Sequence, residues 1–552
     1  MTPVRASGLS RRTLIGAGGL FAAYCGAAFA FRGTGGGGHR AAYYDTHALN
    51  RGNGAEPDTL DPHLASTQYE CNILGDLFLG LMTEDAAGNP VAGAATGFTA
   101  SDDGLVYTFK LRDHVWSDGT PVTAHDYVYS YRRMLDPKTA AQYAALLYPI
   151  KNAQAVNAKL RPAEDLAVRA LDDRTLQIEF MVEVPYVAQL FTHYATFAVP
   201  RHVVERFGDR WQRPQNMVTN GAYTLKEWVS NDHIQLVRNP RFYDAENVKI
   251  ERVRYYPTQD SSAALKRFRA GEIDTQIGVP SQEIGWLKYN MPGALRVAPY
   301  IQTEYVLFNL GTKPFDDLRV REALSLAIDR EVIASRVMHA GESAAYAFVP
   351  PHMPGYPGTA QIRFRSMSME ARAAKARWLL GQAGFGPNNP LIFDYNVPDT
   401  SDARLVAVAM QAMWGAVGAR ANVVPLDEKN HYSLLGKRDF SVARAGWVAD
   451  YRDAKDFLFI LQSTSRDLNN GAYDNPKYDA LIAASDAARD PAERGRLLSQ
   501  AEQLMLDDVA LAPVFNQVSR NLISPAVRGW IGNDINMNRT RYLRLDRSRS
   551  VA

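Results

Sequence analysis

Cysteine is nearly absent from this sequence. Its 552 residues include only Cys25 and Cys71, and Cys25 lies in a segment that we expect to be removed after export. Because one remaining cysteine cannot form an intramolecular disulfide, the fold has to be stabilised by burial of its core. The chain is too long for a single hydrophobic core, so we expect two or three domains.

The sequence also lacks the short motifs of the common extracytoplasmic hydrolases. No two of its eleven histidines lie three to five residues apart, which excludes a pair of zinc ligands on one helix. Cys-x-x-Cys and Gly-x-Ser-x-Gly motifs are absent as well. These absences argue against an enzyme, and we expect neither a metal nor a cofactor. Carboxylates are plentiful, however, so a secreted hydrolase that uses a pair of them remains an alternative.

An excess of charge of either sign is also missing. The chain has 61 basic and 59 acidic residues, and loss of Arg5, Arg11 and Arg12 with the N-terminal segment leaves 58 against 59. Such a chain has no general attraction for nucleic acid or for an anionic membrane. Beyond the N-terminal segment no apolar run approaches the roughly 18 residues of a membrane-spanning helix. We therefore expect a soluble mature protein without membrane insertion.

The start of the chain has the features of an export signal. Arg11 and Arg12 precede an uncharged stretch over 13–31 that is rich in glycine and alanine. This pattern predicts a signal of the twin-arginine type over residues 1–30, with cleavage after Ala30. A membrane anchor is an alternative that the four glycines of the stretch disfavour, and a lipid on Cys25 is another. We expect a periplasmic protein, for which binding, capture and hydrolysis are the activities to consider.

The remainder of the chain alternates strand and helix patterns. The string GTGGGG within residues 31–40 has the composition of a flexible linker, and no Gly-Lys-Ser/Thr follows it as a phosphate loop would require. Apolar periodicity of two or of 3.6 residues then indicates an α/β fold. It predicts strands over 105–112 and 176–182, helices over 317–338, 370–383 and 493–507, and a surface loop over 349–358.

The most distinctive string is WSDGTPVTAHD at 116–126. Taken alone, it predicts a turn at Asp118-Gly119 and a helix that begins after Thr123. It also resembles a signature of the family-5 extracellular solute-binding proteins, most closely the periplasmic oligopeptide-binding proteins of ABC importers. The resemblance continues in order along nearly the whole mature chain, through the segments 56–63 (EPDTLDPH), 218–223 (VTNGAY), 238–240 (RNP), 271–274 (GEID), 316–330 and 443–451 (ARAGWVADY).

The resemblance implies a two-lobed periplasmic-binding-protein fold of type II, cluster C, with an additional domain inserted in the first lobe. Carried over to this sequence, the first lobe comprises residues 41–78, 203–301 and 518–552, and the inserted domain comprises 79–202. The second lobe comprises 302–517, and a hinge is implied near 301 and 518. The implied function is capture of oligopeptides and their delivery to the permease subunits of an inner-membrane ABC importer. A monomer is the expected state.

The candidate binding residues lie around one predicted strand. Phe440, Val442 and Arg444 alternate along it, and an arginine on an apolar face needs an anionic partner. That partner is either an acidic side chain in a structural ion pair or a charged end of the ligand. Asp450 follows where the strand leaves its sheet. By itself such an aspartate is usually a helix cap or a surface charge.

Further roles follow from the resemblance. It implies that Asp450 pairs with the α-ammonium of a peptide and that the backbone around Gly446 and Val448 binds the peptide as an added strand. Trp447 is implied to line a side-chain pocket. Three tyrosines match family positions that line the cleft: Tyr143, Tyr300 and Tyr305.

The sequence departs from the family pattern mainly at the carboxylate end of the ligand. Ser66 replaces an acidic residue, with Gln68 as a nearby polar candidate. Met338 replaces a lysine, with His339 as its neighbour, and a histidine position falls at Ala403 or Arg404. Arg404 would suit a carboxylate, as a fixed bidentate cation. Other departures are Ile277-Gly278-Val279, Asn516 and Gln517.

Three alternatives to oligopeptide capture stay open. The same fold could bind murein peptides or another solute, such as a nickel chelate or an opine-like compound. The secreted hydrolase is the second. A solute-sensing transcription regulator is the third, but the export signal and the lack of a helix-turn-helix before Tyr43 argue against it.

Overall fold

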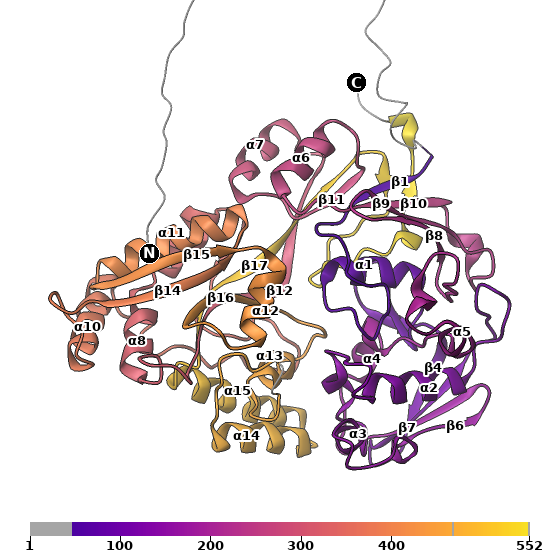
Figure 1. The fold of residues 1–552 in the computed structure, drawn as a ribbon, viewed down its shortest axis with the longest axis horizontal. Coiled ribbons are helices and arrows are strands. Elements are labelled where there is room, and N and C mark those ends of the chain that lie inside the picture. The colour runs from indigo at the N-terminus through magenta and orange to yellow at the C-terminus, as the bar shows by residue number, and fades with distance from the viewer. Residues whose placement is uncertain (1–46, 466–467, 550–552) are drawn as a thin grey trace, which may run out of the picture. The chain divides into compact units, whose positions relative to one another are not determined.

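The computed structural model describes residues 47–465 and 468–549 as an α/β protein (Figure 1). The predicted export signal over 1–30, Cys25 and the linker over 31–40 lie outside the described residues. Within the described residues, no helix combines the length and the hydrophobicity that crossing a bilayer requires.

One large sheet runs through both lobes. Its strand order is β15-β14-β16-β12-β17-β11-β1-β10-β9-β8, and β13 pairs with β17 beside this path. The two long antiparallel strands β12 and β17 join the part of the sheet in the first lobe to the part in the second (Figure 1). The strands are β1 (Leu49–Gly52), β8 (Tyr223–Val229), β9 (His233–Arg238), β10 (Arg252–Tyr256), β11 (Thr275–Ile277), β12 (Leu295–Phe308), β13 (Ser343–Ala344), β14 (Leu391–Pro398), β15 (Ala419–Leu426), β16 (Val442–Val448) and β17 (Leu511–Ile523).

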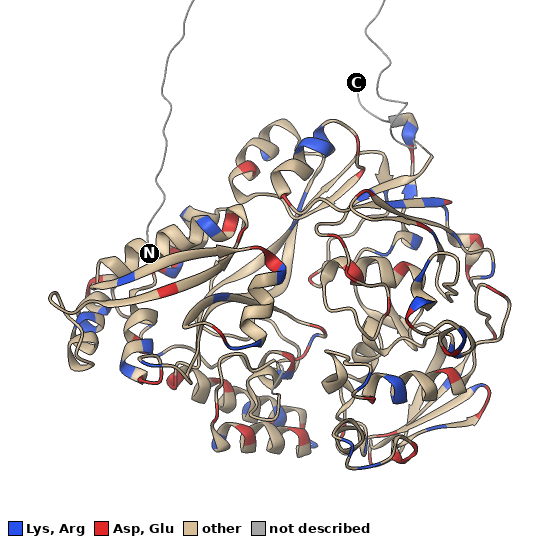
Figure 2. Ribbon diagram, in the orientation of Figure 1, with Lys and Arg blue, Asp and Glu red and all other residues tan. Residues whose placement is uncertain are grey.

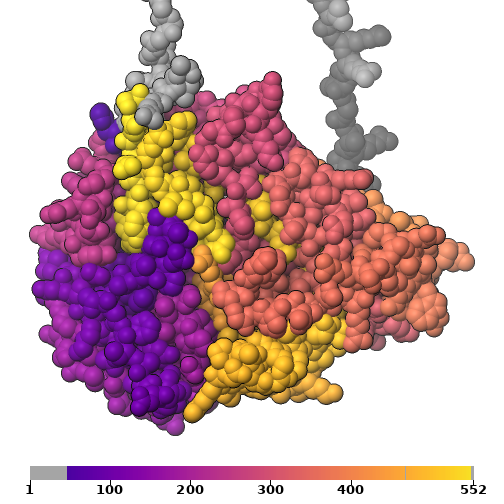
Figure 3. Space-filling model, turned by 180° about the vertical axis from the view of Figure 1, so that it is seen from behind, coloured from indigo at the N-terminus to yellow at the C-terminus, as the bar shows by residue number. Residues whose placement is uncertain are grey.

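The first lobe contains both the beginning and the end of the described chain. Arg547 forms an ion pair with Asp274 (2.6 Å), and the buried Arg539 pairs with Glu84 (3.0 Å). Seen from behind, the N-terminal and C-terminal segments (indigo and yellow) lie together on this side of the molecule (Figure 3). Its further elements are β18 (Val527–Arg528), β19 (Arg544–Leu545), α1 (Gln68–Leu77), α5 (Arg201–Phe207), α6 (Ser261–Arg269) and α7 (Ile284–Asn290). The short paired strands β2 (Met82–Glu84) and β3 (Pro90–Ala92) belong to the region 79–202.

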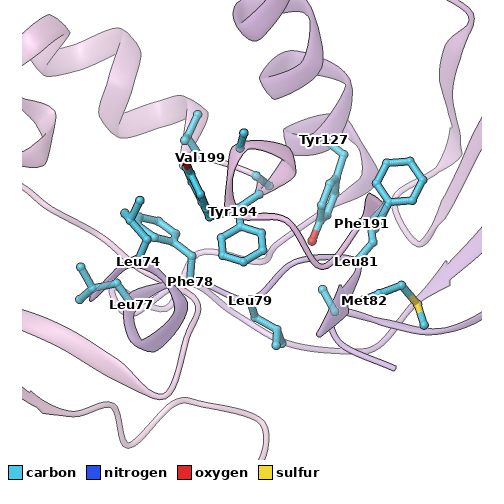
Figure 4. Packing of buried hydrophobic residues seen from close by; sticks show 14 of the residues in the cluster. Leu74, Leu77, Phe78, Leu79, Leu81, Met82, Tyr127, Phe191, Tyr194 and Val199 are labelled. Carbon is cyan, nitrogen blue, oxygen red and sulfur yellow. The ribbon is translucent and has the colours of Figure 1, made fainter. Parts of the chain in front are cut away.

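The region predicted as an inserted domain, residues 79–202, has a sheet of its own, in the order β4-β5-β7-β6. It nevertheless shares one hydrophobic core with the first lobe. Figure 4 shows Leu74 of α1 and Phe78, which follows α1, beside Tyr194 and Val199 of this region. Its elements are β4 (Ala95–Ala100), β5 (Val106–Leu111), β6 (Val168–Asp172), β7 (Thr175–Glu179), α2 (Ala124–Leu135), α3 (Ala153–Asn157) and α4 (Val187–Leu190).

The string at 116–126 forms the predicted turn and helix start. Trp116 is completely buried, and Gly119 has a positive φ of 97° that suits glycine. Thr123 and Asp126 form a capping box at the start of α2. The string is therefore structural in its local contacts.

The second lobe has a separate hydrophobic core, formed by residues between Ile301 and Phe515. Its helices surround the β14, β15 and β16 part of the sheet and form a layer below it (Figure 1). The helices are α8 (Leu318–Ala327), α9 (Arg330–Val332), α10 (Met369–Gln382), α11 (Ser401–Gly415), α12 (Glu428–Gly436), α13 (Lys455–Leu458), α14 (Pro476–Ala487) and α15 (Pro491–Asp507).

The structure confirms the predicted α/β, two-lobed fold and most of the predicted elements. One expected helix, over 317–338, was wrong because it is broken after Ala327. The Asp329 side chain accepts the Val332 N–H and starts α9, and a π-helix follows over Ile333–Met338. Local capping by an aspartate therefore overrides a continuous apolar periodicity.

Pairing between β12 and β17 is interrupted where the sequence predicts a hinge. The register shifts between Pro299 and Thr303 on β12, opposite Val518 and Asn516 on β17. A strand irregularity of this kind bends the chain locally. The hinge near 301 and 518 and the lobe boundaries stay predictions.

Charged side chains of both signs are interspersed over both lobes (Figure 2). Many of them form ion pairs on the surface, such as Lys151 with Glu179 (2.6 Å). This distribution fits the nearly equal numbers of acidic and basic residues in the sequence.

Candidate functional site

One edge of β16 is open beside the predicted site. β16 pairs with β12 along its whole length, from Val442 to Val448, but β14 reaches its other edge only at Val442 and Ala443. Beyond Ala443, that edge has no strand partner in the described part of the chain. An open edge presents backbone donors and acceptors that an extended ligand can use.

Backbone N–H and C=O groups point to alternate sides along β16, and this alternation identifies which residues face the open edge. The Ala449 N–H donates to the Ile301 carbonyl at 2.9 Å. Because alternate residues of an antiparallel strand bond to the same neighbour, Trp447 and Ala445 also face β12. The N–H and C=O groups of Gly446 and Val448 therefore point to the open edge.

The backbone groups of Arg444 point to the same edge as those of Gly446 and Val448, and the Arg444 carbonyl accepts a hydrogen bond from His431 Nε2 (2.9 Å). Burial lowers the pKa of His431 to about 4, so its ring is neutral at neutral pH. His431 thus occupies the edge at Arg444, and the open part of the edge begins at Gly446.

Asp450 lies just beyond the end of β16 and faces the region 79–202. Its Oδ1 is 3.2 Å from Nε2 of His193, and only 12% of the Asp450 side chain is exposed. Its Oδ2 is buried and has no hydrogen-bond partner among the described residues. A buried carboxylate oxygen without a partner is unfavourable, so this atom is suited to bind a ligand donor.

Asp456 supports this arrangement from the side of the second lobe. One of its oxygens accepts the Asp450 N–H (3.0 Å) and the indole N–H of Trp447 (2.9 Å). Burial and the nearby Asp450 charge raise the pKa of Asp456 well above its usual range. Asp456 thus holds the backbone of Asp450 and the indole of Trp447 in place through the same carboxyl oxygen.

Aromatic side chains surround the Asp450 carboxylate. The ring of Tyr143 lies 4.9 Å from the His193 ring, and the Tyr194 ring lies 4.2 Å from it on another side. Burial raises the pKa values of Tyr143 and Tyr300, and the Asp450 charge adds to the rise in both, so both phenols lie near this carboxylate.

Two further predicted residues belong to the same group. The Tyr300 hydroxyl lies 3.5 Å from Gln68 Oε1, and Trp447 packs edge to face against Phe459 with the ring centroids 6.0 Å apart. The structure thus brings Gln68, Trp447 and the two tyrosines Tyr143 and Tyr300 together around Asp450.

Arg444 has an acidic partner within the protein. Its Nη2 lies 2.9 Å from Glu304 Oε2, and Gln302 donates to the other oxygen of Glu304 at 2.6 Å. Burial raises the pKa of Glu304 while the Arg444 charge opposes the rise. A Cβ on Gly446 would come within 2.7 Å of Glu304 Oε1. Glycine at this position therefore leaves room for the ion pair under the open edge.

Two predicted residues lie outside the group at Asp450. Tyr305 is 7% exposed and packs edge to face on Phe348, with ring centroids 5.1 Å apart, in the core of the second lobe. Arg404 is 59% exposed and forms an ion pair with Asp399. No hydrogen bond or ion pair connects Arg404 to Asp450 in the described part of the chain.

Other residues at which the sequence departs from the family pattern have structural roles. Met338 is fully buried, and His339 follows it in a left-handed conformation with φ 43°. Asn516 donates to the Thr303 hydroxyl at 2.9 Å. Asp402, beside Arg404, accepts from Arg520 at 2.6 Å.

The region 79–202 also contacts the second lobe next to Asp450. The rings of Tyr186 and Tyr451 stack with centroids 4.4 Å apart and planes inclined by 9°. The guanidinium of Arg494 lies 5.8 Å from the Tyr186 ring and binds both oxygens of Asp453 at 2.8 and 2.9 Å. On α12, Glu428 accepts a hydrogen bond from Tyr69 of α1.

Sequence reasoning missed three functional candidates: His193, Asp456 and Glu304. His193 is separated from Asp450 by more than two hundred residues of sequence, and no local pattern marks it. Asp456 lies six residues after Asp450, and this spacing is the one signal that could have found it. A group of three or more metal-ligating side chains is not found in the part of the chain that the structure describes.

Comparison with known proteins gives one consistent family. The model of the bacterial extracellular solute-binding proteins, family 5 middle region, matches residues 89–469. The periplasmic oligopeptide-binding protein OppA of Salmonella typhimurium is 40% identical over 497 residues, which cover 89% of this chain and 91% of that protein.

Two solved structures resemble this chain over most of their length. Haemophilus influenzae OppA in complex with the peptide RPPGFSPFR has a TM-score of 0.86 and 33% identity, and the match covers 91% of this chain and 99% of that one. The murein tripeptide binding protein MppA of Escherichia coli has a TM-score of 0.86 and 34% identity, with coverage of 90% and 98%. The family binds solutes for transporters and is not enzymatic. This chain belongs to family 5 of the bacterial extracellular solute-binding proteins.

Proposed function

We propose that this protein is the periplasmic binding component of an ABC importer and that it captures oligopeptides as an added strand. The open edge of β16 carries the proposal, because the backbone groups of Gly446 and Val448 face it. Each residue offers one donor and one acceptor to an extended ligand. Main-chain groups are common to all peptides, so this mode gives affinity without a strict sequence requirement. The similarity to OppA supports the same cargo.

Asp450 holds the N-terminal end of the peptide in this proposal. Its buried Oδ2 accepts from the α-ammonium, and the surrounding tyrosines exclude water, which strengthens the charge-assisted hydrogen bond. Trp447 lines a pocket for a peptide side chain. Gln68, whose Oε1 lies 3.5 Å from the Tyr300 hydroxyl, adds a polar contact at this end. Tyr305 supports the cleft from the core of the second lobe, where it packs on Phe348.

The carboxylate end is held differently. Arg444 shares its charge with Glu304 and reaches a ligand carboxylate directly or through water, while Arg404 is the second candidate cation. Both guanidinium groups already have acidic partners, so this end contributes less charge attraction than the Asp450 end. Murein peptides are the second candidate cargo, because MppA has the same fold and a similar identity to this chain.

Ligand contacts made only when both lobes close on the peptide shift the population toward the closed form, which docks on the permease. An affinity near micromolar, about −8 kcal/mol, suits capture followed by release. Export by the twin-arginine route, a monomeric state and lobe boundaries at 41–78, 203–301 and 518–552 complete the proposal.

Calorimetric titration tests the proposal directly. The exported protein and its Asp450→Ala variant are titrated with a tripeptide and a pentapeptide, each with a free or an acetylated N-terminus. We expect binding of the free peptides to the wild type and its loss on acetylation or on Asp450→Ala. Binding of neither peptide to the wild type would refute peptide capture, and murein fragments and metal chelates would be titrated next. Turnover of a peptide during incubation would instead indicate a hydrolase.

A further inference from the structure

We infer that His193 is a positioning residue for recognition of the ligand ammonium. It donates a hydrogen bond from Nε2 to Asp450 Oδ1 as a neutral ring, so that Oδ2 stays free and the negative charge stays available. This inference rests on the proposed function and deepens it, because it assigns the specificity for a free amino group to a contact between the two lobes.

The tautomer of His193 follows from its second hydrogen bond. The Ala195 N–H donates to His193 Nδ1 at 3.3 Å, as His193 caps the short helical turn over Tyr194–Thr196. A nitrogen that accepts a hydrogen bond carries no proton, so the single proton of the neutral ring is on Nε2. Nε2 faces Asp450 Oδ1 at 3.2 Å and is therefore the donor.

The ring is held firmly in this orientation. His193 is 7% exposed and packs against the rings of both Tyr143 and Tyr194. Rotation of the ring would break the bond to Ala195 and move the donor away from Asp450. Packing and capping together thus fix the direction of the Nε2–H group.

A neutral donor differs from a cation at this position. An arginine or lysine beside Asp450 would orient the carboxylate but would also cancel its charge. Burial raises the pKa of the Cys71 thiol to about 12 and raises the pKa values of Tyr143 and Tyr300, so these three neighbours are uncharged at neutral pH. No arginine or lysine forms an ion pair with Asp450 among the described residues, so its carboxylate can bind one ammonium group.

The contact also connects recognition to lobe closure. His193 belongs to the region that shares its core with the first lobe, whereas Asp450 follows β16 of the second lobe. The carboxylate reaches its fixed orientation only when the two lobes are together. A peptide amine then completes the Asp450 coordination through Oδ2, so closure and ammonium capture favour each other.

The test is a double-mutant cycle on the exported full chain with a free-amine pentapeptide. We expect His193→Leu to weaken binding about tenfold, since a hydrogen bond to a charged group is lost. His193→Gln keeps a donor near the Nε2 position and should bind within about threefold of the wild type. In an Asp450→Asn background, His193→Leu should change the affinity by less than about twofold, because there is no longer a charge to orient.

A spectroscopic measurement on the wild type accompanies the cycle. In the 15N-histidine-labelled wild type, the His193 signals, assigned by their absence from His193→Gln, should show the Nε2–H tautomer at neutral pH. An Nδ1–H tautomer or an imidazolium would overturn the inference. Equal effects of His193→Leu in both Asp450 backgrounds would also overturn it, while peptide binding by the wild type would leave the proposed function intact. If the wild type binds no peptide, the proposed function itself fails.

Discussion

Replacing Val448 by proline tests the added-strand mode at a single atom. The Val448 N–H points away from β12 and toward the open edge, so a proline at this position removes none of the hydrogen bonds between β16 and β12. Proline is tolerated at edge positions of this kind. The ligand, in contrast, loses a donor and meets the proline ring where the hydrogen had been.

The magnitude follows from the peptide carbonyl that is left without its donor. An unsatisfied buried acceptor costs about 1–3 kcal/mol, which corresponds to a loss of affinity of about fivefold to 150-fold. The free energy of unfolding of the ligand-free protein should change by less than about 1 kcal/mol. Ala445→Pro is the matched control on the other edge of β16, because the Ala445 N–H faces Tyr305 on β12. It should destabilise the protein by about 1–3 kcal/mol through the lost ladder bond.

The assay combines calorimetric titration of a pentapeptide with urea unfolding. Val448→Ala, which keeps the N–H group and shortens the side chain, separates the backbone effect from a side-chain effect. The reasoning is refuted if Val448→Pro binds the pentapeptide as well as Val448→Ala does, or if it destabilises the protein as much as Ala445→Pro. Either result would mean that the outward edge of β16 is not the peptide-binding edge.

Three further perturbations have defined expectations. Burial raises the pKa of Glu502 from 4.5 to about 7, so between these pH values the folded chain keeps a proton that the unfolded chain has lost. The free energy of unfolding should therefore fall by about 3 kcal/mol as pH rises from 4.5 to 7. Glu502→Gln should flatten this slope in urea unfolding, and an unchanged slope would contradict the raised pKa of Glu502. Tyr451→Leu removes a ring stack between the lobes and should weaken binding of the free-amine tripeptide and pentapeptide alike, by about fivefold in calorimetry, since stacking contributes about 1 kcal/mol; an effect confined to one of the two peptides would contradict this role. Glu304→Gln leaves Arg444 buried without its acid and should lower the free energy of unfolding by about 3 kcal/mol, most of which the added change Arg444→Met should restore; a stable single variant would show that the pair is dispensable.

The sequence predicts the local elements well where a single periodicity governs them. The helices over 370–383 and 493–507 correspond to α10 and α15, because their apolar stripes and terminal signals agree. The helix expected over 317–338 fails because Asp329 can either continue a helix or cap a new one, and only the tertiary packing decides.

The candidate site also contains residues that the sequence indicates and residues that it does not. Arg444, Gly446, Val448 and Asp450 lie within seven residues of chain, on or just after one strand. Alternation along this strand indicated Arg444, and the resemblance to the family implied the roles of the other three. His193 enters from a distant segment, and its tautomer depends on a backbone N–H that no residue pattern reveals. Whether a cation such as Arg444 serves the ligand or an internal acid depends on Glu304, which lies on another strand.

The single core that the first lobe shares with the region 79–202 restricts how the molecule can move. Leu74 of α1 and the adjacent Phe78 pack with Tyr194 and Val199, and Arg133 of α2 forms an ion pair with Asp61 at 2.6 Å. Separating these surfaces would cost the burial of many side chains, so we expect them to move as one rigid body. We then expect two moving parts instead of three, with β12 and β17 as the strands that connect them. A force that the transporter applies to either part would reach the ligand through a single rotation, and a deletion of the region 79–202 would expose the first lobe's own interior.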